Sequence, residues 1–210
     1  MATLGKFLVS VGVGILLFVG WTLWGTGLQE SQAQDRLGEE FDSLPFMAVE
    51  PLGPRRIPPA NFEFPGPGEP AFRLRVPAID LRKVVVEGVG VEELKLGPGH
   101  YPACRAGFER PLCTDFKEMW PGMEGRVIVS GHRTTYGAPF WDIQKLRRGD
   151  RIITETKWGE FVYEVTHQEV VSPESRDVAI PTNQAELVLT TCNPRFSASE
   201  RLVVFAELMP

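Results

Sequence analysis

The sequence has few residues of the kinds that mark nucleic-acid binding or thiol redox chemistry. Its 210 residues carry a net charge of −5 and contain no run of Lys and Arg, which excludes the basic surface of a nucleic-acid-binding protein. It contains three cysteines and three histidines, and no cysteine pair has the Cys-x-x-Cys spacing of a thiol oxidoreductase. Any thiol or imidazole chemistry therefore depends on very few side chains.

Charged residues are also missing from the N-terminal stretch between Phe7 and Leu28. As a helix this stretch would be about 33 Å long, which is enough to cross a hydrocarbon core of about 30 Å. Trp21 and Trp24 lie near its end, where amphipathic rings favour the membrane interface. We therefore predict a transmembrane signal anchor over residues 7–28.

The residues around this stretch indicate its orientation. Lys6 precedes it, and positive charge at that end favours a short cytoplasmic N-terminus over residues 1–6. We expect a single-pass plasma-membrane protein whose remaining chain lies on the extracellular, cell-wall side. A cleaved signal peptide is the alternative, because Ser31–Ala33 resembles a small-residue cleavage site. Both interpretations export the rest of the chain.

Proline recurs through the segment from Pro45 to Pro70, which disfavours a helix or a central strand there. We interpret residues 29–70 as an extracellular linker, semi-rigid in polyproline form, that lifts a domain off the membrane. For the last part of this linker the alternative is packing on the domain through Phe62 and Phe64. The domain itself would occupy residues 71–210.

Short apolar or alternating stretches separated by turn residues run through this domain. The candidate strands are residues 72–76, 84–86, 126–131, 151–156, 160–171, 186–191 and 201–208. Lys157–Glu160 has the composition of a hairpin turn, and only residues 91–96 and 138–149 have a helical pattern. Many short strands with turn signals between them predict a mainly β domain, either a sandwich or a closed barrel.

In an exported domain, three cysteines leave at least one thiol unpaired. Cys104 and Cys113 share a loop that contains glycine and proline, so they are the candidate disulfide, which would contribute roughly 2–3 kcal/mol. Cys192 remains, and it is followed by an Asn-Pro pair that ends the strand candidate 186–191. A free cysteine acting as a small buried hydrophobe is the alternative. The position at a strand end favours a nucleophile instead.

A nucleophilic thiol needs a general base. His132 also follows an apolar strand candidate, so in a barrel it would lie at a rim, as Cys192 would. His100 stands among turn-forming residues, and we interpret it as a loop histidine bonded to backbone. His167 lies inside a long strand pattern and is interpreted as a surface or core histidine. His132 is therefore the candidate base.

The developing oxyanion also needs a cation or a hydrogen-bond donor. Arg201 begins the last strand candidate and would return close to Cys192 if the final two strands pair antiparallel. Its guanidinium is always charged and offers several donors, which suits a carbonyl oxygen that becomes negative. Arg133 and Arg195 are the rival arginines, and an exposed strand-edge arginine is the alternative interpretation of Arg201.

Taken together, these residues resemble the sortase family. The family's histidine, cysteine and arginine signatures are matched in order by VIVSGH, by LVLTTC and by the arginine that opens RLVVFAEL. The longer stretches GHRTTYGAPFWDIQKLRRGD and TTCNPRFSASERLVV are similar to class E sortases of high-GC Gram-positive bacteria. The resemblance covers about Phe72 to Leu208.

This resemblance implies a closed eight-stranded β-barrel with a few short helices that acts as a cysteine transpeptidase. Its substrates would be exported proteins with a C-terminal sorting signal, LAXTG or LPXTG-like, cut between Thr and Gly. Cys192 would form a thioester, His132 would transfer protons and Arg201 would hold the substrate carbonyl or its oxyanion. An amine of a peptidoglycan precursor would accept the acyl group. No cofactor is implied.

The resemblance also assigns two substrate contacts. Thr191 would help to position the substrate, and Tyr136 matches a tyrosine that class E enzymes associate with LAXTG signals. The segment Cys104–Gly125 departs from the family pattern, because it is longer than expected. It would be either a rim loop that narrows the substrate groove or an inert addition. Carboxylates are scattered along the chain, so we predict no metal site.

Two other functions stay open. Another exported cysteine enzyme of the cell wall, such as an L,D-transpeptidase, would share the thiol and the histidine, but its SxGC sequence is absent. A catalytically inactive, membrane-tethered β-barrel that serves as a binding module is the non-enzymatic alternative. Such a module would be expected to lose His132, Cys192 or Arg201, and all three are present.

Overall fold

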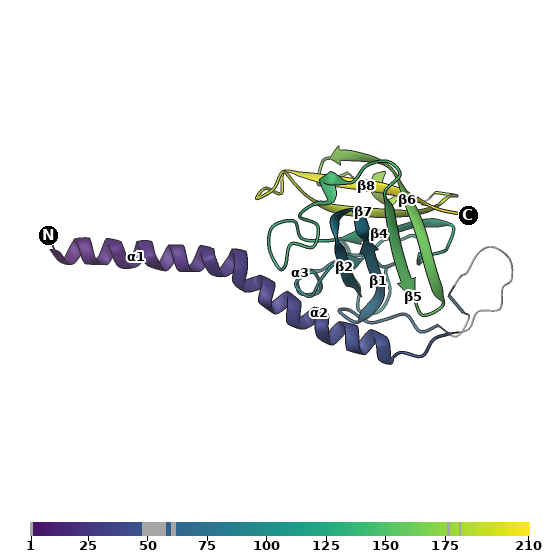
Figure 1. Ribbon diagram of the computed structural model, residues 1–210, viewed down its shortest axis with the longest axis horizontal. Helices are drawn as coiled ribbons and strands as arrows, with labels where there is room; N and C mark the ends of the chain where they lie inside the picture. Colours follow the sequence, from purple (N-terminus) through teal and green to yellow (C-terminus); the bar gives the residue numbers. More distant parts are fainter. Residues whose placement is uncertain (1, 48–57, 60–61, 176, 181) are drawn as a thin grey trace.

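In the part of the chain that the structure describes, eight strands close into a barrel, and a long helical rod leaves one side of it (Figure 1). The structure is a computed structural model that describes residues 2–47, 58–59, 62–175, 177–180 and 182–210. Much of the predicted polyproline spacer, residues 48–57 and 60–61, lies outside the described residues. The eight-stranded barrel expected from the family resemblance is confirmed.

The barrel strands follow the short apolar stretches of the sequence. They are β1 (Pro70–Val76), β2 (Leu81–Glu87), β3 (Gly99–His100), β4 (Gly125–Ser130), β5 (Arg151–Thr156), β6 (Gly159–Val171), β7 (Ala185–Asn193) and β8 (Glu200–Leu208). Their order around the barrel is β1-β2-β3-β4-β7-β8-β6-β5, and antiparallel pairing of β1 with β5 closes it. The pairs β2–β3 and β4–β7 are parallel. The parallel β4–β7 pairing ends two residues before His132 and Cys192, the predicted base and nucleophile.

Alternation along the strands fills the barrel interior. In β5, for example, Ile152 and Thr154 are buried inside the barrel, whereas Arg151 at the start of the strand is exposed. The core cluster includes Phe72, Leu74, Trp120, Val127, Tyr163, Leu187 and Val204. Each large apolar side chain that is fully removed from water contributes roughly 1.5–3 kcal/mol before entropy is counted. This packed interior gives the strand ends fixed positions.

Two local expectations need correction. The helical pattern over residues 138–149 forms only a short 3₁₀ turn, η3 (Ile143–Lys145), because the segment opens with Ala138 at a left-handed φ of 45° and then Pro139. His100 is not a loop residue: it is fully buried in β3, whose two residues are too few to give a periodic signal. The expected helix at 91–96 is present as α3 (Val91–Leu94).

The rod consists of three helical segments. These are α1 (Ala2–Gly20), a π-helical segment η1 (Trp21–Gly25) and α2 (Thr26–Ser43). Within α1, the window Thr3–Gly20 has a mean hydropathy of 2.0, and none of it is buried in the protein. By length and composition this window can cross a membrane. It ends earlier than the expected boundary at residue 28.

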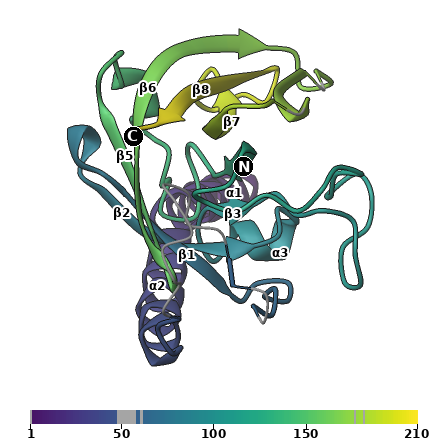
Figure 2. The ribbon, with the colours of Figure 1, turned by 90° about the vertical axis from the view of Figure 1, so that its right-hand side faces the viewer.

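The helix α2 occupies the start of the segment expected to be a linker, residues 29–70. Its buried residues Ala33, Leu37 and Phe41 recur at helical spacing on one face, which packs on the barrel. Leu37 lies in one apolar cluster with Val84 and Val86 of β2. Figure 2 shows α2 beneath β1 and β2, on the side away from β7 and β8. The first part of the expected linker is therefore a helix that covers the barrel.

The end of the expected linker also packs on the domain, as the alternative interpretation proposed. The Phe62 ring makes edge contacts with Trp120 and Trp158, at centroid distances of 5.2 and 4.8 Å. Phe64 stacks on Trp120 at 6.0 Å. These aromatic contacts hold the chain against the barrel directly before β1 begins.

Candidate active site

One cavity of about 570 Å³ lies at the ends of β4, β7 and β8. Cys192, His132 and Arg201 all line it. The three residues are far apart in the sequence, and each was selected because it lies at a strand end. The structure therefore brings the predicted nucleophile, base and oxyanion partner to the same cavity, whose size is typical of a ligand site.

The parallel pairing of β4 with β7 positions His132 beside Cys192. The two strands run in register up to Ser130 and Thr190, two residues before His132 and Cys192 respectively. Beyond that pair, the Gly131 amide donates to the Thr190 carbonyl at 3.1 Å. The Thr191 hydroxyl, which is buried, donates to the Gly131 carbonyl at 2.6 Å. Thr191 therefore lines the cavity and also fixes the backbone on which His132 is mounted.

The antiparallel pairing of β7 with β8 brings Arg201 to the thiol. Cys192 and Arg201 are directly opposite each other in this ladder, so their side chains share one face. The thiol is partly exposed, and Nη1 of Arg201 donates to the carbonyls of Ala198 and Glu200, both at 3.0 Å. These bonds hold the guanidinium at the cavity rim beside Cys192.

The two rival arginines make other contacts. Arg133 is buried, and its Nη1 donates to the Cys192 carbonyl at 3.0 Å and to the Asn193 side chain at 2.6 Å. Arg195 donates to Asp142 at 3.2 Å and stacks on the Trp141 ring. Arg133 therefore fixes the backbone of the cysteine, and Arg195 fixes the outer loop. Among the described residues that line the cavity, Arg201 is the one arginine.

His132 is in an environment that disfavours charge on its ring. Burial lowers the pKa of His132 below its ordinary value of 6.5. Within the described residues, its buried Nε2 has no hydrogen-bond partner. The Tyr136 ring lies against the imidazole, with centroids 5.0 Å apart and planes tilted by 35°. A neutral imidazole with an unpartnered nitrogen is suited to exchange a proton with a reacting group.

The walls of the cavity are largely apolar. The segment between β6 and β7 contributes Pro173, Val178 and Ala179 on one side, and Val89 and Leu94 contribute from around α3. The long segment between β3 and β4 also reaches the cavity, through Pro111 and Leu112. Cys104 and Cys113 are joined in a disulfide next to these two residues. The additional segment is therefore part of the cavity wall.

One other cluster has a spacing that could hold a metal ion. Ligand atoms of Glu87, His100 and Glu118 lie within 4.8 Å of one another. Arg105, however, donates to Glu87 at 2.9 Å and to Glu118 at 3.2 Å, so a cation of the protein already pairs with both carboxylates. The Met119 carbonyl, 2.8 Å away, engages Nε2 of His100. We interpret the cluster as an ion-pair network that holds the β3–β4 segment on the barrel.

Sequence reasoning missed the residues that support the site from α2. The Thr26 hydroxyl accepts a hydrogen bond from the Tyr136 amide at 3.0 Å, and the Glu30 carboxylate packs against Gly137. A signal was present, because Thr26, Glu30, Ala33, Leu37 and Phe41 recur at three- and four-residue spacing along one helical face. Only the last three are apolar, which made the stretch resemble a polar linker.

Comparison with known proteins gives a consistent family assignment. A sequence model described as "Sortase domain" matches residues 74–209. Sortase SrtE1 of Streptomyces coelicolor is 30% identical over 98% of this chain, and this chain spans 56% of the length of that relative.

Solved structures agree. Sortase E of Streptomyces avermitilis is 31% identical, with a TM-score of 0.56 over 70% of this chain and 91% of that one. Sortase E1 of S. coelicolor, solved with a tripeptide in its active site, is 28% identical, with a TM-score of 0.57 over 70% and 92% of the two chains. The residues matched by the sequence model, 74–209, include every residue that lines the cavity.

Proposed function

Because the chain belongs to the sortase family and is similar to class E members, we propose that it is a membrane-anchored cysteine transpeptidase. Its substrate would be an exported protein with a C-terminal LAXTG- or LPXTG-like sorting signal, cut between Thr and Gly. The observation that carries this proposal is the single cavity lined by Cys192, His132 and Arg201. An L,D-transpeptidase or an inactive binding module has no comparable support.

In the first half of the reaction, the sulfur of Cys192 attacks the threonine carbonyl carbon, and His132 takes the thiol proton. The carbonyl oxygen becomes negative, and the guanidinium of Arg201 stabilises it from the opposite strand. His132 then gives its proton to the glycine nitrogen as the C–N bond breaks. The result is a thioester between Cys192 and the substrate threonine, with the C-terminal fragment released as an amine.

In the second half, an amine of a peptidoglycan precursor attacks the thioester carbon. His132 takes a proton from that amine, the C–S bond breaks, and the thiolate of Cys192 recovers a proton. The exported protein ends in an amide bond to the cell-wall precursor. The lowered pKa of His132, which follows from its burial, supports a resting state with a neutral ring that acts first as a base.

Different observations bear on the two further site residues, Thr191 and Tyr136. Thr191 lines the cavity beside Cys192, which supports its role as a substrate-positioning residue. Tyr136 contacts His132, but among the described residues it is not part of the cavity lining. A substrate contact of Tyr136 stays a prediction that depends on how the sorting signal lies over His132.

The location of the enzyme follows from the apolar helix. We propose that the window Thr3–Gly20 crosses the plasma membrane with the N-terminus in the cytoplasm. The barrel then lies on the cell-wall side, where exported proteins and peptidoglycan precursors are present. Lys6, at the N-terminal end of the rod, supports this orientation.

The proposal is tested with the purified full chain, an LAXTG peptide and a panel of candidate amines, with products identified by mass spectrometry. We expect a covalent thioester on Cys192 and an amide product with at least one amine. Cys192→Ala should abolish both while the thermal unfolding curve stays unchanged. Arg82→Gln, at an exposed arginine of β2 outside the cavity lining, serves as a control for general loss of a cation, and it should retain the thioester. Cleavage by Cys192→Ala would contradict the proposal.

A further inference from the structure

The loop that follows His132 has an unusual backbone. Three consecutive residues have left-handed φ angles, 49° at Tyr136, 69° at Gly137 and 45° at Ala138. Residues with a Cβ adopt this region rarely, and a bulky aromatic residue does so more rarely still. Such a conformation persists only where the surroundings hold it in place. The structure identifies those surroundings as the beginning of α2.

Thr26, in the first turn of α2, makes the first of these contacts. Its Oγ1 accepts a hydrogen bond from the Tyr136 amide at 3.0 Å and itself donates to the Thr22 carbonyl at 2.9 Å. The donated bond fixes the hydroxyl, so its lone pairs face the loop. The Thr26 side chain is buried between the helix and the loop. The Tyr136 amide therefore has a fixed hydrogen-bond acceptor, which the N-terminal helix α2 supplies.

Glu30, one turn later, makes the second contact. Its carboxylate is 2% exposed, and the Lys83 ammonium lies 2.6 and 2.8 Å from its two oxygens. The carboxylate packs so closely on Gly137 that a Cβ added there would lie 2.3 Å from Oε2. Only glycine fits this approach, and Glu30 thereby blocks the loop from moving towards α2.

The loop in turn carries the Tyr136 ring, which lies 5.0 Å from the His132 imidazole. We propose that Thr26 and Glu30 are positioning residues, which hold the Tyr136–Ala138 loop in its left-handed conformation and so keep the Tyr136 ring on His132. This inference rests on the proposed function, because it assigns to His132 the proton transfers of the reaction. The inference adds that the barrel needs α2 for full catalytic activity.

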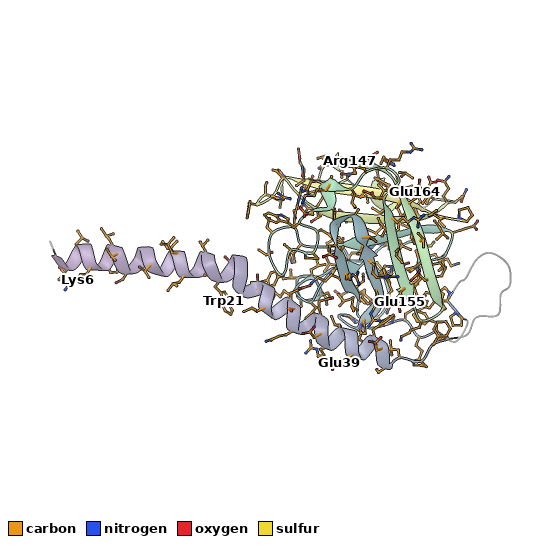
Figure 3. All side chains as sticks on the ribbon, viewed as in Figure 1. Lys6, Trp21, Glu39, Arg147, Glu155 and Glu164 are labelled. Carbon is orange, nitrogen blue, oxygen red and sulfur yellow. A yellow bond between two sulfur atoms is a disulfide. The ribbon has the colours of Figure 1, made fainter. Side chains whose placement is uncertain are left out.

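The helix that supplies these contacts continues into the apolar rod. η1 joins α1 to α2, and a Cβ at Gly25 would lie 2.5 Å from the Trp21 ring, so the bend is closely packed. Figure 3 shows Trp21 at this bend and Glu39 on the face of α2 that points away from the barrel. Thr26 and Glu30 therefore lie on a helical run that is continuous with α1, and Glu39 offers a control position on the same helix.

The test uses the full chain in lipid nanodiscs and compares Thr26→Val, which has nearly the same shape but no acceptor, with Thr26→Ser, which keeps the hydroxyl. For Thr26→Val we expect kcat for an LAXTG peptide to fall about tenfold, because a displaced catalytic group slows the reaction. KM should change by less than about twofold, because the cavity walls are untouched. Thr26→Ser and the exposed control Glu39→Gln should match the parent in both constants.

A second readout does not depend on activity. The pKa of the His132 ring is followed by NMR in the same variants. In Thr26→Val it should rise towards 6.5, because burial is what lowers it and the freed Tyr136 ring no longer excludes water. The other titratable or charged side chains that line the cavity are Tyr101, Glu174, Cys192 and Arg201, and none of them is changed.

The outcomes separate this inference from the proposed function. A parent-like kcat together with a parent-like His132 pKa in Thr26→Val would overturn the inference. Loss of activity with an unchanged His132 pKa would also overturn it. If Thr26→Val does not fold, Glu30→Gln, which keeps the shape but weakens the Lys83 pair, must show the same two shifts. Cleavage by Cys192→Ala would remove the proposed function and leave the NMR test intact.

Discussion

Both ring nitrogens of His100 have oxygen partners inside the barrel, and these partners determine its charge. Nε2 lies 2.8 Å from the Met119 carbonyl, which can only accept, so this nitrogen carries a proton. Nδ1 lies 2.8 Å from Glu87. Burial alone would lower the pKa of His100, but the charge and hydrogen bond of Glu87, followed by Glu118 and the Met119 carbonyl, raise it above 6.5. The raised pKa of His100 therefore favours an imidazolium ring beside Glu87.

This pair predicts that stability falls as the pH rises. A histidine whose pKa is raised by folding stabilises the protein fully below 6.5, its ordinary value, and the contribution is lost as pH rises through the folded-state value. Each unit of raised pKa corresponds to about 1.4 kcal/mol. Urea unfolding from about pH 6 to about pH 9 should show the free energy of unfolding decreasing, and His100→Gln should flatten the curve. Parallel curves for parent and variant would contradict the assignment.

For single residues, the sequence allowed a prediction of function where the residue type is rare in this chain. Cys192, His132 and Arg201 could be selected because few thiols and imidazoles exist and each of the three stands at a strand end. Arg133 was weighed only as a rival cation, because a sequence does not reveal that its guanidinium bonds to the Cys192 carbonyl. The role of Thr26 depends on a contact with Tyr136 across 110 positions of chain, which no local pattern encodes.

The β3–β4 segment, which is longer than the family pattern predicts, combines a disulfide with part of the cavity wall. It contains the Cys104–Cys113 disulfide, and Pro111 and Leu112 from the same loop line the cavity. The Tyr101 hydroxyl donates to the Pro111 carbonyl, which ties the loop to the barrel wall. The half-exposed Leu112 side chain is therefore held over the groove in which we expect the sorting signal to bind.

Removing the disulfide should therefore weaken substrate binding more than chemistry. For Cys104→Ser/Cys113→Ser we expect KM for an LAXTG peptide to rise about three- to tenfold with kcat nearly unchanged, and the free energy of unfolding to fall by roughly 2–3 kcal/mol. Steady-state kinetics and urea unfolding measure these effects. Leu112→Ala with the disulfide intact should reproduce the KM change without the stability loss. An unchanged KM in both variants would make the loop a passive addition.

Elements were predictable from the sequence where local pattern and tertiary packing agree. The strands β5 and β6 and the turn between them carry both alternation and turn residues, and they form where expected. The helical pattern over residues 138–149 forms only η3, because the segment opens with Ala138 at a left-handed φ of 45°. The helix α2 was hidden because part of its buried face is polar: Thr26, Glu30 and Gln34 bond to the barrel through side chains.

At the scale of the whole molecule, α2 packs on the barrel although it precedes the barrel strands in the sequence. Arg73 of β1 pairs with Asp42 at 2.8 Å, and the Arg73 guanidinium also lies over the Phe41 ring. Gln34 bonds to both the amide and the carbonyl of Val84. Within the described residues, the contacts of this helix with the barrel and its loops therefore begin near Thr26.

Truncation tests how much α2 contributes to the stability of the barrel. A chain of residues 44–210 loses the burial of Leu37 and Phe41, each worth roughly 1.5–3 kcal/mol, so its free energy of unfolding should be several kcal/mol lower than that of residues 21–210. Urea unfolding of the two soluble chains measures the difference. Residues 21–210 serve as the control for loss of the apolar rod alone. Equal stability of both chains would show that α2 is dispensable for the fold.

The helical run from α1 through η1 to α2 would also limit how far the barrel lies from the membrane, if α1 crosses it as proposed. Thr26 contacts the loop beside His132 only six positions after Gly20, so at about 1.5 Å of rise per residue the proposed membrane span would end about 9 Å away along the helix. Within the described residues 2–43, no loop separates α1, η1 and α2, so a barrel packed on α2 would stay close to the bilayer. Under the proposed orientation, we expect the active site to meet its two reactants close to the surface of the bilayer.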